Sequence, residues 1–162
     1  MIDEQTFLDN ALTAWQRHHN MTYSLLEQLT EEQLQAPLPR PGLNTFAKHF
    51  EEMAHVQHDY ARAFYTHALK FTPDNIYTGD FSQVELHGML KEADQAIENG
   101  ITACQAEQLI DIFGMQGTRA DLIQTLLHHE LFHHGQFSIF SYEMKINLPE
   151  DWRDFWWIPA RF

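Results

Sequence analysis

Apolar residues recur every three or four positions in the first part of the chain, from about Asp3 to Leu34. This spacing places side chains on one face of an α-helix. The first predicted helix has a mostly apolar stripe formed by Ala11, Trp15, His18, Thr22, Leu25 and Leu29. The segment "APLPRPG" follows, and its three prolines end the helix because proline cannot continue one.

The same spacing predicts a second helix, which Asn44 can cap and which runs to about Lys70. The stripe that should face the core consists of Phe46, Phe50, Met53, Gln57, Tyr60 and Phe64. The residues that follow, "FTPDNIYTGDF" at 71–81, are rich in turn formers and predict a loop.

A third helix is predicted to begin at Ser82 and Glu85, which have the spacing of a capping box. Its inward residues should be Leu86, Leu90, Ala93 and Ile97. Gly100 either ends this helix or is tolerated within it.

A fourth helix should begin at the pattern Thr118-x-x-Asp121 and run to about Lys145. Its inward stripe should be Leu122, Leu126, His129, His133, Gln136 and Phe140. The tail that follows, "NLPEDWRDFWWIPARF", is rich in aromatic residues. No alternating pattern is long enough to build a sheet. The chain is therefore expected to be all-α, with residues 1–162 forming one four-helix-bundle domain and an aromatic C-terminal tail.

Composition narrows the range of partners and locations. The chain has 23 acidic and 10 basic residues and a net charge of −13, which repels phosphate backbones and anionic lipids. Neither nucleic acid nor a membrane surface is expected as a partner. Cys104 is the only cysteine, which excludes an internal disulfide and suits a reducing compartment. The acidic N-terminus lacks an apolar signal region, so a cytoplasmic location is expected.

The segment "LLHHELFHHGQF" carries the candidate chemistry. His129 and His133 continue the apolar stripe of the fourth helix, and their spacing places both imidazoles on one face, where they can bind one metal ion. His128 and His134 lie off this stripe and should be surface groups or neighbours of the site. The histidines also match H-E-x-x-H, but a zinc protease is disfavoured because no sheet is predicted and Gln136 replaces the glycine of the extended motif.

Two E-x-x-H motifs, "EMAH" and "ELFH", raise the alternative of a di-iron carboxylate bundle. That site requires both residues of each motif to point inward. At about 100° per residue, His55 lies opposite the inward stripe of its helix, and Glu130 lies well off that of the fourth helix. A di-iron site is therefore the less favoured alternative.

A third metal ligand should come from the second helix, where His49, Glu52 and His55 are the candidates. Measured from the centre of the apolar stripe, His49 lies roughly 60° away, Glu52 roughly 120° and His55 roughly 180°. Helix geometry therefore excludes His55 and ranks His49 above Glu52.

Several segments resemble the DinB/YfiT-like superfamily of metal-binding four-helix bundles. The ending "HELFHHGQ" is similar to the family's paired histidines followed by Arg-Gly-Gln, with His134 in place of the arginine. "PGLNTFAKHFEEMAHVQHDY" resembles the family's second helix, and "INLPEDWRDFW" resembles its C-terminal segment. The resemblance implies that His129 and His133 are ligands and that the third ligand position falls on Glu52, with His49 as the alternative or as a neighbour of the site.

The resemblance also implies a class of function. Relatives include metal-dependent transferases of low-molecular-weight thiols and a thiol-dependent isomerase, and dimers are common among them. A divalent ion, Zn or Ni, is expected, because imidazole suits both. With three protein ligands a coordination position remains for water or substrate, so the chain is expected to act on a small molecule as a transferase or hydrolase. Gln136 is expected either to orient a ligand or substrate or to form a hydrogen bond in helix packing. The alternative is a non-catalytic bundle whose metal is structural, or whose aromatic tail forms a homodimer.

Overall fold

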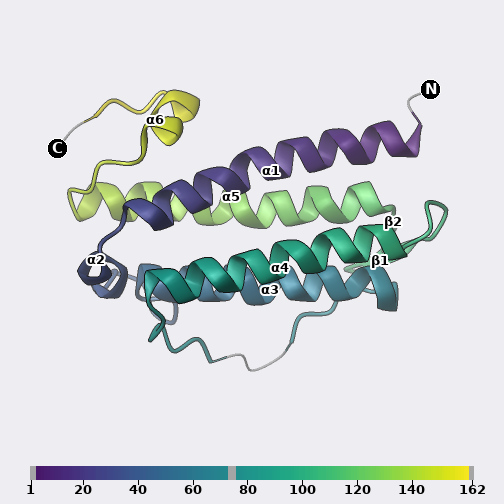
Figure 1. Ribbon diagram of the computed structural model, residues 1–162, viewed down its shortest axis with the longest axis horizontal. Coiled ribbons are helices and arrows are strands. Elements are labelled where there is room, and N and C mark those ends of the chain that lie inside the picture. The colour runs from purple at the N-terminus through teal and green to yellow at the C-terminus, as the bar shows by residue number, and fades with distance from the viewer. Residues whose placement is uncertain (1–2, 73–75, 161–162) are drawn as a thin grey trace.

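Four long helices make up most of the structure, a computed structural model that describes residues 3–72 and 76–160 (Figure 1). Their bounds are α1 (Glu4–Gln28), α3 (Phe46–Thr66), α4 (Gln83–Ala103) and α5 (Arg119–Glu143). Two short helices, α2 (Glu31–Gln35) and α6 (Glu150–Trp156), lie at one end of the bundle. The prediction of an all-α helical bundle is confirmed.

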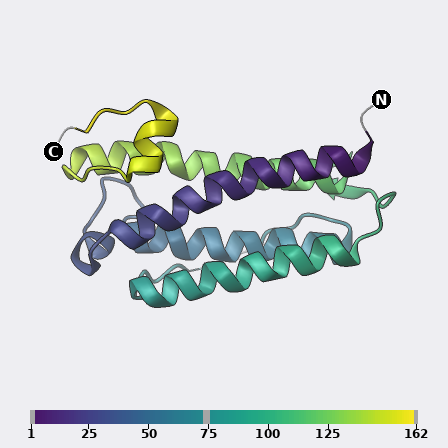
Figure 2. The ribbon, with the colours of Figure 1, turned by 45° about the horizontal axis from the view of Figure 1, so that its top comes forward.

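The four helices form two pairs. The most extensive packing is between α3 and α4 and between α1 and α5, and Figure 2 shows the two pairs lying one above the other. Each pair is amphipathic, so the pairs bury their apolar faces against each other. The stripes predicted for α1, α3 and α4 face this interior, since all their members except half-buried Ala11 are buried.

The apolar core is divided into two clusters along the bundle axis. One cluster contains Phe50 and Phe137, and the other contains Phe64 and Leu126. Between them lie buried polar side chains contributed mainly by α1, α3 and α5, namely His19, Thr22, His49, Gln57, Glu130, His133 and His134. A polar layer therefore crosses the middle of the bundle, and it contains the residues of chemical interest.

Several helix ends differ from the predictions. The first helix ends at Gln28 instead of continuing to Leu34, because Leu29 adopts an extended conformation and Thr30 caps the separate helix α2. Thr45, not Asn44, caps α3. The same helix ends at Thr66 rather than near Lys70, because the next residue adopts a left-handed backbone conformation. The predicted capping boxes of α4 and α5 are both present.

A small hairpin was not expected from the sequence. Strands β1 (Ile110–Ile112) and β2 (Met115–Gly117) pair antiparallel through a two-residue turn at Phe113 and Gly114, which both have positive φ. Three-residue strands are too short to show an alternating pattern, which explains why the sequence analysis missed them.

Two glycines of the long helices have different surroundings. Gly100 lies within α4, and a Cβ there would come within 2.7 Å of the Phe64 ring, so the glycine allows α4 to approach α3 closely. Gly135 on α5 is exposed, and a Cβ there would have no neighbour within 4 Å.

The aromatic tail is partly buried. Trp152 of α6 is fully buried, Phe155 is half-buried, and Trp157 is 91% exposed. Residues 73–75 of the predicted loop and Phe162 of the tail lie outside the described residues. Within the described ranges, no helix has the length and apolar character needed to cross a membrane.

Candidate metal centre

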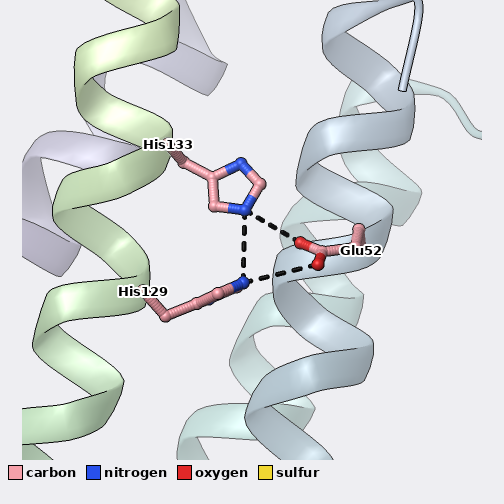
Figure 3. A group of neighbouring side chains, drawn as sticks. All are labelled: Glu52, His129 and His133. Atoms are coloured by element: carbon pink, nitrogen blue, oxygen red, sulfur yellow. Dashed lines mark hydrogen bonds and ion pairs between the residues drawn. The ribbon is translucent and has the colours of Figure 1, made fainter. Parts of the chain in front are cut away.

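Glu52 from α3 and His129 and His133 from α5 converge between the two helix pairs (Figure 3). His133 Nε2 lies 3.3 Å from His129 Nε2 and 2.9 Å from Glu52 Oε2. His129 Nε2 lies 3.4 Å from Glu52 Oε1. The structure thus brings together the three residues that the sequence and the family resemblance singled out.

The spacing of these donor atoms suits a shared cation. The Nε2 atoms of the two imidazoles face each other, and each can offer its lone pair to a metal ion when its hydrogen is on Nδ1. Glu52 Oε2 is buried and makes no aligned hydrogen bond despite its short distance to His133. Ligands about 2.0–2.1 Å from a tetrahedral zinc ion lie about 3.3 Å from one another, close to the separations here. The residues therefore fit a divalent ion.

The group is closed on one side and open on the other. His133 is buried, whereas the side chains of Glu52 and His129 are 16% and 19% exposed. Among the residues that the structure describes, no fourth histidine, cysteine or carboxylate completes the group. An ion held here would have a coordination position accessible from the solvent side.

The protonation states of the group favour metal binding. Burial alone would raise the pKa of Glu52, but the close contacts with His129 and His133 outweigh it and hold that pKa well below its usual range. Burial lowers the pKa of His133, although the close contact with the Glu52 carboxylate opposes the change. At neutral pH the group therefore presents a carboxylate and a neutral His133 imidazole, the forms that bind metal ions.

His49 is a neighbour of the site. Its Nδ1 lies 3.0 Å from Nδ1 of His133, whose other nitrogen faces Glu52. Burial, followed by proximity to His133 and Arg40, lowers the pKa of His49 to about 3, so His49 stays neutral and can accept the Nδ1 hydrogen that His133 would carry with a metal ion at its Nε2. Such a contact fixes the tautomer and orientation of a metal-binding histidine.

The other residues considered from the sequence lie outside the three-residue group. His55 and His128 are exposed, as expected. Gln136 lies near the next turn of α5 beyond His133, and its Oε1 accepts a hydrogen bond from Arg40 rather than contacting a ligand. Among the described residues, no hydrogen bond or ion pair joins Gln136 to the three converging residues.

Glu130 and His134 form a second polar cluster on the side of α5 that faces α1. Glu130 is buried and accepts hydrogen bonds from Trp15 Nε1 at 3.1 Å, from His19 Nδ1 at 3.0 Å and from the Thr22 hydroxyl. His134 is also buried, with its Nε2 2.9 Å from Thr22 Oγ1. The His134 side chain is therefore not a surface group but lies in the interior beside α1.

His19 joins this cluster to α4. Its second nitrogen, Nε2, lies 2.8 Å from Asp94 Oδ1, and Asp94 also accepts hydrogen bonds from Tyr23 and Gln57. Burial alone would lower the pKa of His19, but the charge of Glu130 and the contacts with both carboxylates raise it to about 10. His19 is therefore a buried imidazolium between two carboxylates.

His19 and Asp94 were not among the site residues predicted from the sequence. The available signal was weak: His19 and Thr22 continue the apolar side of α1 formed by Leu8, Trp15 and Leu26, but a polar residue in such a stripe does not reveal its partner on another helix.

The orientations of Glu130 and His55 bear on two rival sites. A zinc protease needs the glutamate of H-E-x-x-H beside the metal, whereas Glu130 points to the opposite side of the helix toward α1. A di-iron site needs both E-x-x-H motifs to converge, whereas His55 is exposed. Neither arrangement is formed.

Comparisons with known proteins concern the fold and the family of the chain. No curated protein matches the chain. A crystal structure of a DinB-like protein from Bacillus cereus ATCC 10987 at 2.01 Å resolution superimposes with a TM-score of 0.68 at 18% identity, covering 88% of this chain and 95% of that one. At this identity the likeness shows the fold. A family model, that of the DinB superfamily, matches residues 14–137, which include the three converging residues. The chain belongs to the DinB superfamily.

Proposed function

We propose that the chain is a metal-dependent enzyme that acts on a small molecule, as a transferase of a low-molecular-weight thiol or as a hydrolase. The observation that carries the proposal is the set of three converging donor residues, Glu52, His129 and His133, with two of the three side chains partly exposed. A divalent ion held there, Zn or Ni, would lower the pKa of a bound thiol or water and supply a nucleophile near neutral pH.

The chain's own residues contribute orientation and shielding. His49 holds the His133 ring through its Nδ1, which leaves Nε2 free to face Glu52. Phe50 and Phe137 cover the inner side beyond His49 and exclude water there. A substrate would therefore approach from the side on which Glu52 and His129 are accessible.

A structural metal is the rival function. A structural ion is usually held in a closed site by four protein ligands. Here the described residues offer three ligands and leave one side of the site accessible. This difference is the reason for preferring an enzyme.

The first test is metal content. Protein purified without a histidine tag should contain about one Zn or Ni ion per chain, measured by mass spectrometry. Glu52→Ala, His129→Ala and His133→Ala should each abolish tight binding. His49→Ala should weaken it by about 10- to 100-fold, as expected for a residue that orients a ligand. His128→Ala, on the exposed side of the helix, is the matched control and should bind normally. Full occupancy in the His129/His133 double variant would exclude this site.

The second test is reactivity. Cobalt-substituted protein should change its visible spectrum when a panel of low-molecular-weight thiols is added, and thiol transfer to electrophilic acceptors should depend on Glu52. If cobalt binds stoichiometrically but no thiol or substrate analogue alters its spectrum, the structural-metal function is favoured instead.

Three further features belong to the same proposal: a cytoplasmic location, a small-molecule substrate with no nucleic-acid partner, and a homodimer. The single cysteine, Cys104, and the net charge of −13 support the first two. The exposed Trp157 of the tail supports the third. Size-exclusion chromatography with light scattering of the full chain and of Trp157→Ala tests the dimer.

A further inference from the structure

Two cations meet at one pocket in this acidic protein. Only 10 of the 162 residues are lysine or arginine, yet Arg40 and Lys48 both line a pocket of about 460 Å³. Pro41, Leu43 and Tyr77 form neutral walls of the same pocket. Because the net charge is −13, a locally cationic pocket differs from its surroundings and would attract anions that the rest of the surface repels.

This pocket adjoins the candidate metal centre on both of its helices. Lys48 precedes Glu52 by four residues on α3, which places the two side chains on one face about one turn apart. Arg40 contacts Gln136, which lies close to one turn beyond His133 on α5. Tyr77 in the pocket wall also packs against His55, the residue three positions beyond Glu52.

The hydrogen-bond donors at this place lack anionic acceptors. Among the described residues, neither Arg40 nor Lys48 forms an ion pair with a carboxylate, although the chain has 23 acidic residues. Arg40 donates one N–H group to Gln136 Oε1, which leaves the rest of its guanidinium available. Gln136 lies outside the lining of the pocket, and its oxygen holds the guanidinium of Arg40 from the side of α5.

We propose that Arg40 and Lys48, with Gln136 orienting the guanidinium of Arg40, form a binding subsite for a carboxylate of the substrate, so that the substrate reaches the metal centre with its other end. This inference rests on the proposed function, and it narrows the substrate class to small anionic molecules, such as thiols that carry a carboxylate. A carboxylate fits this subsite because two parallel N–H groups of the planar guanidinium match its two coplanar oxygens, and phosphate, which a guanidinium also binds through two hydrogen bonds, is the comparison in the test.

The test uses cobalt-loaded protein and a series of mercapto acids with two to five methylene groups, each compared with the mercapto alcohol of equal length. Binding is followed by the cobalt spectrum. At least one acid should bind about tenfold more tightly than its alcohol, as expected for a hydrogen bond to a charged group. Arg40→Gln should remove this preference, and Arg40→Lys should restore part of it.

Arg17→Gln is the matched control, because it removes the same charge from α1, where Arg17 lies over the ring of Phe155. It should keep the preference for acids. Equal binding of acids and alcohols at every length, or an equal effect of Arg17→Gln and Arg40→Gln, would overturn the subsite.

Failure of the proposed function gives a different result. If no thiol changes the cobalt spectrum, the subsite is measured on metal-free protein by nuclear magnetic resonance titration with glutarate and with inorganic phosphate. Saturable shifts with glutarate that disappear in Arg40→Gln would support the carboxylate subsite without the metal chemistry. Tighter binding of phosphate than of glutarate, or no binding of either, would overturn it.

Discussion

Glu130 directly follows His129 in the sequence, yet the two side chains belong to different sites. His129 faces Glu52 on α3, whereas Glu130 is buried against α1 and pairs with His19. Successive helix positions differ by about 100°, which is enough to separate a candidate metal ligand from a structural carboxylate. The residue that gives the sequence its protease-like motif is therefore part of the polar core.

Substituting Glu130 should reduce stability. Glu130→Gln keeps the shape but leaves the His19 imidazolium with Asp94 as its single carboxylate partner. Breaking one side of a buried ion pair in this way should cost about 3 kcal/mol. Urea unfolding of metal-free protein measures the change. The exposed Glu143→Gln should lie within about 0.5 kcal/mol of the unchanged protein. Equal stability of the two variants would contradict the assigned role of Glu130.

His19 should make stability fall at alkaline pH. Its folded pKa of about 10 lies above the ordinary value of 6.5, because Glu130 and Asp94 outweigh the effect of burial. The folded state therefore binds the proton more tightly, so this contribution is complete below pH 6.5 and is lost as pH rises through about 10. Unfolding of metal-free protein at pH 7 and pH 9.5 should show the decline. His19→Gln should flatten it, and an unchanged slope in that variant would argue against an imidazolium at this position.

Residue patterns predicted one face of α5 and missed another. The spacing of Leu122, Leu126 and His133 correctly indicated an inward stripe, but α5 is also buried on the side facing α1. Ile123, Glu130, His134 and Ser141 lie on that second side and look like surface positions when one stripe is assumed. A helix covered by neighbours on two sides has little hydrophobic asymmetry, so its polar buried residues cannot be recognised from spacing.

At the scale of elements, the helices themselves were predictable and their ends were less so. The capping boxes at Ser82 and Thr118 are encoded locally and were found from the sequence. The break after Gln28 depends on Thr30 capping α2, through a third capping box that was not recognised in the sequence. Which residue of α3 faces the two histidines similarly depends on how α3 is rotated against α5. The apolar stripe alone does not give this rotation, and it ranked His49 above Glu52.

Helix α6 should contribute to stability mainly through one residue. Trp152 is fully buried, its Nε1 donates a hydrogen bond to Met21 O at 2.5 Å, and its ring lies 4.2 Å from that of His134. Trp152→Ala should therefore cost about 3–5 kcal/mol, as for other large core aromatics. Trp157→Ala, at a 91% exposed position, should change the stability of the monomer little. Denaturant unfolding of the two variants tests the assignment, and a large effect of Trp157 alone would contradict it.

At the scale of the whole molecule, the polar layer joins the two helix pairs. Glu52 belongs to the α3 and α4 pair, whereas His129 and His133 belong to the α1 and α5 pair. His19 and Asp94 make a second connection between the pairs, from α1 to α4. The apolar clusters on either side of this layer supply the burial, and the polar contacts fix how one pair is placed against the other.

A metal ion bound at Glu52, His129 and His133 would therefore link the pairs and stabilise the whole bundle. An ion that binds only the folded state adds about 2.7 kcal/mol at a free concentration 100 times its Kd. For a chain of this size, that corresponds to a rise in Tm of roughly 5–10 °C. Thermal unfolding of the chelator-treated protein, with and without added Zn, measures the shift.

Two matched variants show whether the metal ion stabilises the protein by joining the helix pairs or by acting on α5 alone. Glu52→Ala removes the only converging residue of α3 and keeps both histidines of α5. It should lose most of the Zn-induced rise in Tm, whereas His128→Ala should keep all of it. If Zn raised the Tm of Glu52→Ala as much as that of the unchanged protein, the ion would be held by α5 alone. The metal would then not join the two halves of the bundle, and the open three-ligand site on which the proposed chemistry depends would be absent.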